Sequence, residues 1–184
     1  MTEMMMSRRG MFGGALAAGT LLALPMPSFA ATGEKRLAFR NVHNNERIDA
    51  RYFGANGFDR QGLAEINRGL RDWRTGEVAQ MDKELLDLLV AVRDRLGMAP
   101  NRQFDLISGY RSSRTNNALR ARGGSHTGVA TKSQHMLGKA TDIAMPGVST
   151  GRVKLAAMSL RRGGVGWYPR DGFVHVDTGR VRSW

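Results

Sequence analysis

The chain has 184 residues, a length that suits one globular domain better than two. It contains no cysteine, which excludes disulfides, thiolate metal ligands and a cysteine nucleophile, so any bound metal must be held by nitrogen and oxygen atoms. The formal net charge of +12 favours an anionic partner such as a cell-wall polymer or a membrane surface. Nucleic acid binding would rest on this charge alone and is the weakest candidate, so we expect no nucleic acid partner.

Residues 1–30 have the pattern of an export signal. The pair Arg8-Arg9 is followed by an apolar stretch over 11–24, which is too short to span a bilayer comfortably. Ser28-Phe29-Ala30 offers a small-x-small cleavage site, so we expect removal of residues 1–30. The paired arginines favour the twin-arginine route, with an ordinary secretory signal as the alternative. The sequence thus predicts a periplasmic protein with no membrane span after cleavage and one domain over 31–184.

The first part of this domain predicts a hairpin and two helices. Alternating polar and apolar residues over 36–40 and 47–52 are typical of two short strands. Apolar residues at helical spacing predict a helix over 61–74. A second helix is expected from a cap at Asp82 through Leu96, with a broad leucine-rich face that is suited to a core.

The second part is richer in short strands. Strands are expected over 104–107, 140–144, 165–168 and 173–177, with brief helices over 115–122 and 153–160. The order predicts an α+β fold in which a small antiparallel sheet carries the polar residues and the helices lie on one side.

Candidate metal ligands follow from the alternation of side chains along a strand. Asp142 points away from the apolar face of its predicted strand, and His175 and Asp177 share one face of theirs. His135 lies shortly before the first of these strands. Two imidazoles and one carboxylate leave a tetrahedral position of Zn²⁺ open, which is typical of hydrolytic rather than structural zinc sites. We therefore predict that His135, Asp142 and His175 bind one Zn²⁺ per chain, which activates a water molecule.

Four further residues are candidates for catalysis or substrate binding. Asp177 is expected either to take a proton as general base or to orient His175, and the sequence leaves both roles open. Arg111 could grip a substrate carboxylate with its planar guanidinium or brace its own loop. Ser133 could bond to substrate or to the backbone, and Tyr168 could line a substrate cleft or simply pack.

The two remaining histidines have weaker claims. His126 lies in a glycine-containing loop and is expected to be exposed, with a place at the site as the alternative. His43 lies in the predicted hairpin turn and is expected to take no part.

Several motifs match a known family. They are Ser108-Gly-Tyr-Arg-Ser112, Ser133-x-His135-x6-Asp142, Gly163-Gly-Val-Gly-Trp-Tyr-Pro169, Phe173-Val-His-Val-Asp-Thr-Gly179 and Arg182-x-Trp184. Together they resemble the zinc peptidases of the D-alanyl-D-alanine carboxypeptidase superfamily, and within it the exported murein endopeptidases of the MepK group. The resemblance implies the fold shared with the Hedgehog signalling domain, one zinc ion on the three predicted ligands, and hydrolysis of peptide bonds in peptidoglycan.

One position departs from the pattern of this superfamily. Many of its members carry an acidic base three residues before the last histidine, where this chain has Gly172. Because of this departure the resemblance does not identify the base, and Asp177 becomes the stronger candidate for that role. For the MepK group the resemblance implies cleavage of cross-links that involve meso-diaminopimelate, the L,D type among them.

The leading hypothesis is therefore a zinc endopeptidase that opens peptidoglycan cross-links during wall growth, with the peptide stems as its partner. A carboxypeptidase that trims a terminal D-amino acid is one alternative. A non-catalytic zinc module that binds wall peptide is another, because a binding module could keep its metal. The sequence does not give the oligomeric state.

Overall fold

The computed structural model of the chain describes residues 33–123 and 128–184. The predicted export peptide and His126 lie outside the described residues. Within the described ranges, no helix is both long enough and apolar enough to cross a membrane.

The described part of the chain opens with three strands and two helices and ends with three strands. The strands are β1 (Lys35–Asn41), β2 (Arg47–Gly54), β3 (Gly57–Phe58), β4 (Gln103–Ser108), β5 (Ala140–Ala144), β6 (Gly164–Tyr168), β7 (Phe173–Asp177) and β8 (Arg182–Ser183). The helices are α1 (Arg60–Gly69), α2 (Lys83–Arg95), α3 (Ser113–Gly123), α4 (Thr150–Leu160) and the 3-10 turn η2 (Gln134–Leu137).

These strands form one mixed sheet in the order β3-β2-β1-β4-β5-β7-β6-β8. The α+β class is confirmed, but the prediction of a small antiparallel sheet is wrong: the sheet has eight strands, and the pairs β1/β4 and β6/β8 are parallel. Parallel neighbours need a long crossover connection, and the segment with α1 and α2 supplies it between β1 and β4. The two-residue strands β3 and β8 are too short to show an alternating pattern in the sequence.

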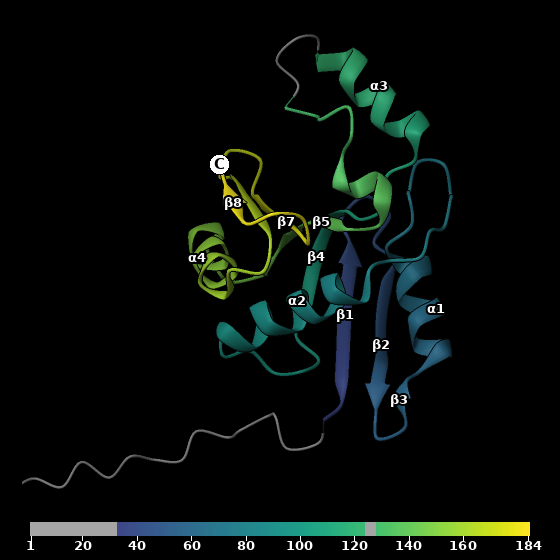
Figure 1. Ribbon diagram of the computed structural model, residues 1–184, viewed down its shortest axis with the longest axis vertical. Helices are drawn as coiled ribbons and strands as arrows, with labels where there is room; N and C mark the ends of the chain where they lie inside the picture. The colour runs from purple at the N-terminus through teal and green to yellow at the C-terminus, as the bar shows by residue number, and fades with distance from the viewer. Residues whose placement is uncertain (1–32, 124–127) are drawn as a thin grey trace, which may run out of the picture.

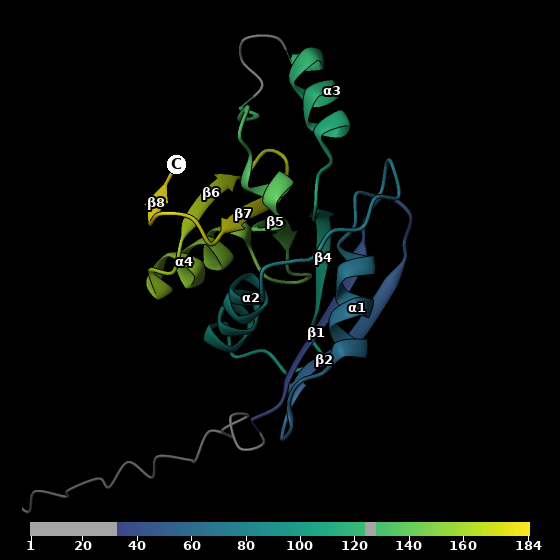
Figure 2. The same ribbon diagram turned by 45° about the vertical axis from the view of Figure 1, so that its right-hand side comes forward.

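Helix α2 forms where the sequence predicts it. The carboxylate of Asp82 accepts a hydrogen bond from the backbone N–H of Glu84 and so caps the first turn. The leucine-rich face is buried against the sheet, with Leu85, Leu86 and Leu89 at 0% exposure. Figures 1 and 2 show α1, α2 and α4 on one face of the sheet, whereas α3 stands apart at one end of the molecule.

The first helix is shorter than predicted. It ends at Gly69 rather than near residue 74, because the carbonyl of Leu70 accepts a hydrogen bond from the backbone N–H of Tyr110 at 2.7 Å. This bond is made by a residue just beyond β4, so a distant part of the chain decides where α1 ends. Residues 70–76 therefore form a turn that lies beside the loop after β4.

The sheet separates the hydrophobic core from the predicted site. Ile143 in β5 and Val174 and Val176 in β7 are fully buried in the core beneath the helices. Because side chains alternate along a strand, Asp142 and His175 project from the opposite face. The two strands pair antiparallel, with Asp142 directly across from His175.

Candidate metal centre

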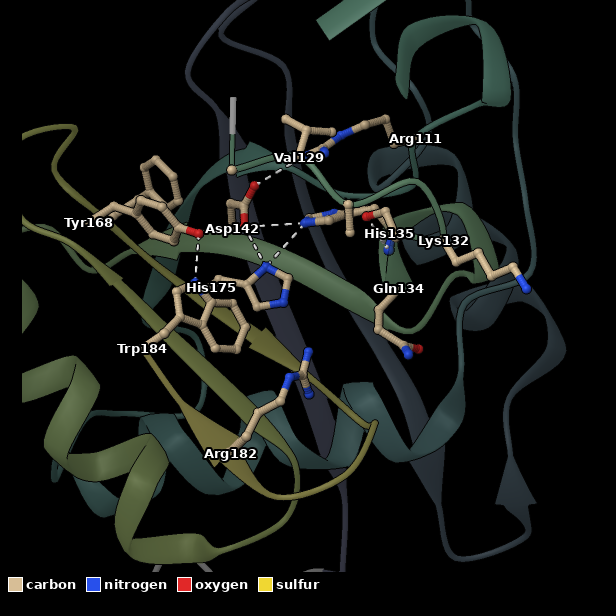
Figure 3. Close-up of a pocket in the computed structure, with 14 residues that line it drawn as sticks. Arg111, Val129, Lys132, Gln134, His135, Asp142, Tyr168, His175, Arg182 and Trp184 are labelled. Carbon is tan, nitrogen blue, oxygen red and sulfur yellow. Dashed lines mark hydrogen bonds and ion pairs between the residues drawn. The ribbon is translucent and has the colours of Figure 1, made fainter. Parts of the chain in front are cut away.

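His135, Asp142 and His175 converge on one point above β5 and β7. His135 is carried by η2, and Ser133 caps this turn by accepting a hydrogen bond from the backbone N–H of His135. Figure 3 shows both imidazoles and the carboxylate pointing toward one another. All three residues are buried, with exposed fractions of 3%, 5% and 8% in that order.

The three facing atoms form a nearly regular triangle. His135 Nε2 lies 3.2 Å from His175 Nδ1 and 3.2 Å from Asp142 Oδ1, and His175 Nδ1 lies 2.8 Å from Asp142 Oδ1. Two ligands of a tetrahedral zinc ion, each about 2.0–2.1 Å from the metal, lie about 3.3 Å apart. The triangle therefore has the dimensions of three corners of a zinc tetrahedron.

The outer ring nitrogens fix which nitrogens face inward as acceptors. His135 Nδ1 lies 2.8 Å from the carbonyl oxygen of Gly109, which can only accept, so Nδ1 carries the proton. His175 Nε2 lies 3.0 Å from Asp177 Oδ2 and donates to it in the same way. In the neutral tautomers the two inward nitrogens are then lone-pair donors that face a carboxylate oxygen, an arrangement that suits a shared cation. Among the described residues, no other group of histidine and acidic side chains has this geometry.

The charges of the site favour an ionised carboxylate. Burial alone would raise the pKa of Asp142, but the charges and hydrogen bonds of His135 and His175 outweigh it and hold the pKa well below its usual range. Burial lowers the pKa of His135. Burial alone would also lower the pKa of His175, but the hydrogen bonds to Asp142 and Asp177 outweigh this effect and raise the pKa.

A cavity of about 220 Å³ opens beside the triangle. Arg111, Ser133 and Tyr168, all predicted from the sequence, line it together with the three candidate ligands. Further lining residues were not singled out as site residues from the sequence; they include Lys132 and Gln134, together with Phe173, Arg182 and Trp184, which entered only as parts of the family motifs. In Figure 3 the aromatic rings of Tyr168 and Trp184 lie on the opposite side of the histidines from Lys132.

Arg111 is a buried cation next to Asp142. Its Nη2 lies 3.3 Å from Asp142 Oδ2 and 3.3 Å from Ser108 Oγ, and the residue is 8% exposed. Its Nε is buried and has no hydrogen-bond partner among the described residues. Arg111 also lines the cavity, so its guanidinium places a positive charge where an anionic group could bind.

The loop that carries Arg111 is held by Asp72. One oxygen of this buried carboxylate accepts hydrogen bonds from the backbone N–H and the hydroxyl of Ser112, at 2.9 and 2.7 Å. The other oxygen accepts from the backbone N–H of Arg74 at 3.0 Å. Burial alone would raise the pKa of Asp72, but hydrogen bonds from Thr115, Ser112 and Arg74 lower it below its usual value.

We expect Asp72→Asn to destabilise the fold in a pH-dependent way. Since the pKa is lower in the folded state, the ionised group stabilises the fold above its usual pKa of 3.8, and this contribution is lost as the pH falls through the folded pKa. Urea unfolding should give a loss of about 1–3 kcal/mol at pH 7 that shrinks toward pH 3.5. Asp49→Asn, at an exposed ion pair with Arg36, is the control and should cost little. A loss that is the same at both pH values would contradict the assignment.

Asp177 lies behind His175, away from the triangle. The two ring nitrogens point in opposite directions, so the one that meets Asp177 is not the one that meets Asp142. Asp177 is 0% exposed and does not line the cavity. Hydrogen bonds from His175 and Arg182 outweigh the effect of burial and hold the pKa of Asp177 well below its usual range. This geometry favours the orienting role over that of a general base.

The other sequence candidates take clear positions. Ser133 bonds to the backbone of its own turn. Tyr168 stacks on Phe173, with ring centroids 4.6 Å apart, and its hydroxyl accepts a hydrogen bond from Trp184 Nε1 at 2.8 Å. His43 is exposed, stacks on Trp73 and does not line the cavity.

No acidic side chain stands at Gly172, the position where the superfamily pattern described above has its base. Gly172 lies in the turn between β6 and β7 with a φ of +76°, and it does not line the cavity. Among the described residues that line the cavity, Asp142 has the only acidic side chain.

Comparison with known proteins supports the motif resemblance. A family model described as "Peptidoglycan L,D-endopeptidase MepK" matches residues 29–184. The chain belongs to this family. The peptidoglycan L,D-endopeptidase MepK of Escherichia coli (strain K12) is 41% identical over 174 residues, which cover 93% of this chain and 92% of the relative. The probable peptidoglycan L,D-endopeptidase MepK of Haemophilus influenzae is 43% identical over 148 residues, 80% of this chain and 77% of the relative. No solved structure matches the chain at a significant level.

Proposed function

We propose that this chain is a zinc-dependent peptidoglycan endopeptidase that hydrolyses peptide cross-links, including the L,D type. The observation that carries the proposal is the convergence of His135 Nε2, Asp142 Oδ1 and His175 Nδ1, within 3.2 Å of one another, beside a cavity. Membership of the MepK family supports the choice of peptidoglycan as the substrate.

The three converging residues would hold the metal. When bound, zinc supplies Lewis acidity that polarises a peptide carbonyl and acidifies a water molecule. The chain contributes a fixed set of donors: Gly109 orients His135 through its carbonyl, and Asp177 orients His175 through its carboxylate. Asp142 contributes the negative charge, and it is held ionised by its neighbours.

Arg111 and Lys132 would select for anionic substrate groups. Both side chains line the cavity; Arg111 is buried beside Asp142, and Lys132 is exposed. The stem peptides of peptidoglycan are rich in carboxylates, which a planar guanidinium binds well. The aromatic side chains of Tyr168 and Trp184 offer an apolar surface on the other side of the cavity.

Residues 1–30 complete the proposal as an export peptide that delivers the domain over 31–184 to the periplasm. The Arg8-Arg9 pair supports the twin-arginine route, which carries folded proteins.

Chromatography of defined muropeptides tests the proposed reaction. We expect zinc-loaded protein to convert cross-linked dimers into monomers, and we expect a chelator to stop this conversion and added zinc to restore it. Dimers with an L,D cross-link and dimers with a D,D cross-link, incubated separately, would reveal the preference of the site.

The alternatives give different products. Release of only a terminal D-amino acid would favour the carboxypeptidase. Retention of zinc and binding of muropeptides without turnover would favour the non-catalytic module. Cleavage that continues after complete removal of zinc would contradict a metal-dependent mechanism.

A further inference from the structure

The short strand β8 brings a cation to the back of the metal centre. It pairs parallel with β6, with Arg182 next to Gly164 and Ser183 next to Val165. From this position the guanidinium of Arg182 meets Asp177 through two parallel bonds, Nη1 to Oδ1 at 3.0 Å and Nη2 to Oδ2 at 2.7 Å. Such a two-point contact fixes the plane of a carboxylate as well as its place.

The same carboxylate is the partner of His175. Asp177 Oδ2 accepts from Arg182 and from His175 Nε2, and Asp177 Oδ1 also accepts from the backbone N–H groups of Gly164 and Gly179. The chain of contacts therefore runs from Arg182 through Asp177 and the imidazole ring to the inward Nδ1. Every acceptor position of the carboxylate is engaged, so its rotation is restricted.

Two glycines in β6 make room for this arrangement. A Cβ at Gly164 would lie 2.3 Å from Arg182 Nη1 and 2.5 Å from Asp177 Oδ2. A Cβ at Gly166 would lie 2.7 Å from the ring of Trp184. The glycine-rich motif that precedes Trp167 thus provides space for the residues of the Arg182-x-Trp184 motif.

Trp184, the residue after β8, anchors this strand to β6 through three hydrogen bonds. Its backbone N–H donates to the carbonyl of Val165, its carbonyl accepts from the backbone N–H of Trp167, and its indole N–H donates to the hydroxyl of Tyr168. The Arg182 guanidinium carbon lies 4.8 Å from the centroid of the Trp184 ring, at the distance of a cation–π contact. The Trp184 ring also lies 5.3 Å from that of His175.

We propose that Arg182 is a positioning residue of the metal centre, which acts through Asp177 to hold His175 Nδ1 toward His135 and Asp142. The proposal rests on the zinc site of the proposed function. In a simple surface ion pair, removal of Arg182 would leave zinc binding unchanged. In the proposed role, removal of Arg182 weakens the binding of a metal that it does not touch.

Zinc affinity, measured by competition with a chromogenic chelator, tests the proposal without any peptidoglycan substrate. We expect Arg182→Gln to weaken zinc binding measurably, by at most the about 10–100-fold cost of losing Asp177, the direct partner of His175. Arg182→Lys should restore part of the affinity, because lysine keeps the charge but lacks the two-point fork. The matched control is Arg180→Gln, an exposed arginine of the same loop whose backbone carbonyl, not its side chain, contacts Arg182. It should bind zinc like the native chain.

Two results would overturn the proposal. One is an Arg182→Gln variant that binds zinc as tightly as Arg180→Gln. The other is an unchanged NMR chemical shift of the His175 ring nitrogens in the metal-free, labelled Arg182→Gln variant, since loss of the two-point contact should alter the hydrogen bond between His175 Nε2 and Asp177. If Arg182→Gln does not fold, Arg182→Lys decides the question by the same comparison with Arg180→Gln. A native chain that binds zinc but cleaves no cross-link would contradict the proposed function and leave the role of Arg182 intact.

Discussion

The His175→Ala variant will lose its zinc and its activity together. The native chain is expected to bind about one zinc ion, and the variant retains only His135 and Asp142 as donors at the centre. The loss of affinity should exceed the about 10–100-fold cost of removing an outer partner, since a direct ligand is missing. Metal analysis after equilibration with a weak chelator measures the loss, and muropeptide chromatography measures the activity.

His43→Ala is the matched control for this experiment. His43 is exposed, bonds to the carbonyl of Ile107, stacks on Trp73 and does not line the cavity. Its replacement should leave zinc content and turnover at native values. Full zinc occupancy at native affinity in His175→Ala would remove His175 from the set of ligands.

The predicted grouping of the site residues rested on strand alternation. Since successive side chains point to opposite faces, Asp142 had to leave the core on the side opposite Ile143, and His175 had to leave it opposite its valine neighbours. The structure places these two residues directly across from each other in neighbouring strands. This pairing depends on contacts distant in sequence, so no local pattern contained it.

The role of Asp177 shows where local reasoning ends. Strand geometry gives the distance between His175 and Asp177, but not which ring nitrogen faces the carboxylate. That choice depends on the rotamer of His175 and on Arg182, which reaches Asp177 only because β8 joins the edge of the sheet. A two-residue strand has no periodicity to detect, so the sequence could offer Arg182 only as part of a motif.

The size of the sheet was also predicted wrongly because it depends on contacts between segments that are distant in sequence. The parallel contact between β1 and β4 joins segments that are separated by two helices, and propensity does not report such a contact. In contrast, α2 followed from its own residues, because the cap at Asp82 and the buried leucines are local features. The end of α1 was misplaced because Tyr110, far along the chain, bonds to Leu70.

Asp177→Asn separates the two roles that the sequence left open. If Asp177 orients His175, the variant binds zinc about 10–100-fold more weakly, and turnover returns to within about tenfold of native once zinc is saturating. The carboxylate of Asp177 accepts from Arg182 with both oxygens and from His175 with Oδ2. An asparagine amide has only one acceptor oxygen, so it cannot accept all of these bonds. Initial rates of cross-link cleavage as a function of free zinc measure both effects at once. Asp171→Asn, in the turn between β6 and β7, is the control; Asp171 is exposed and does not line the cavity, so this variant should match the native chain. Native zinc affinity combined with lost turnover at every zinc concentration would instead assign the general base to Asp177, against the geometry that buries its carboxylate behind His175.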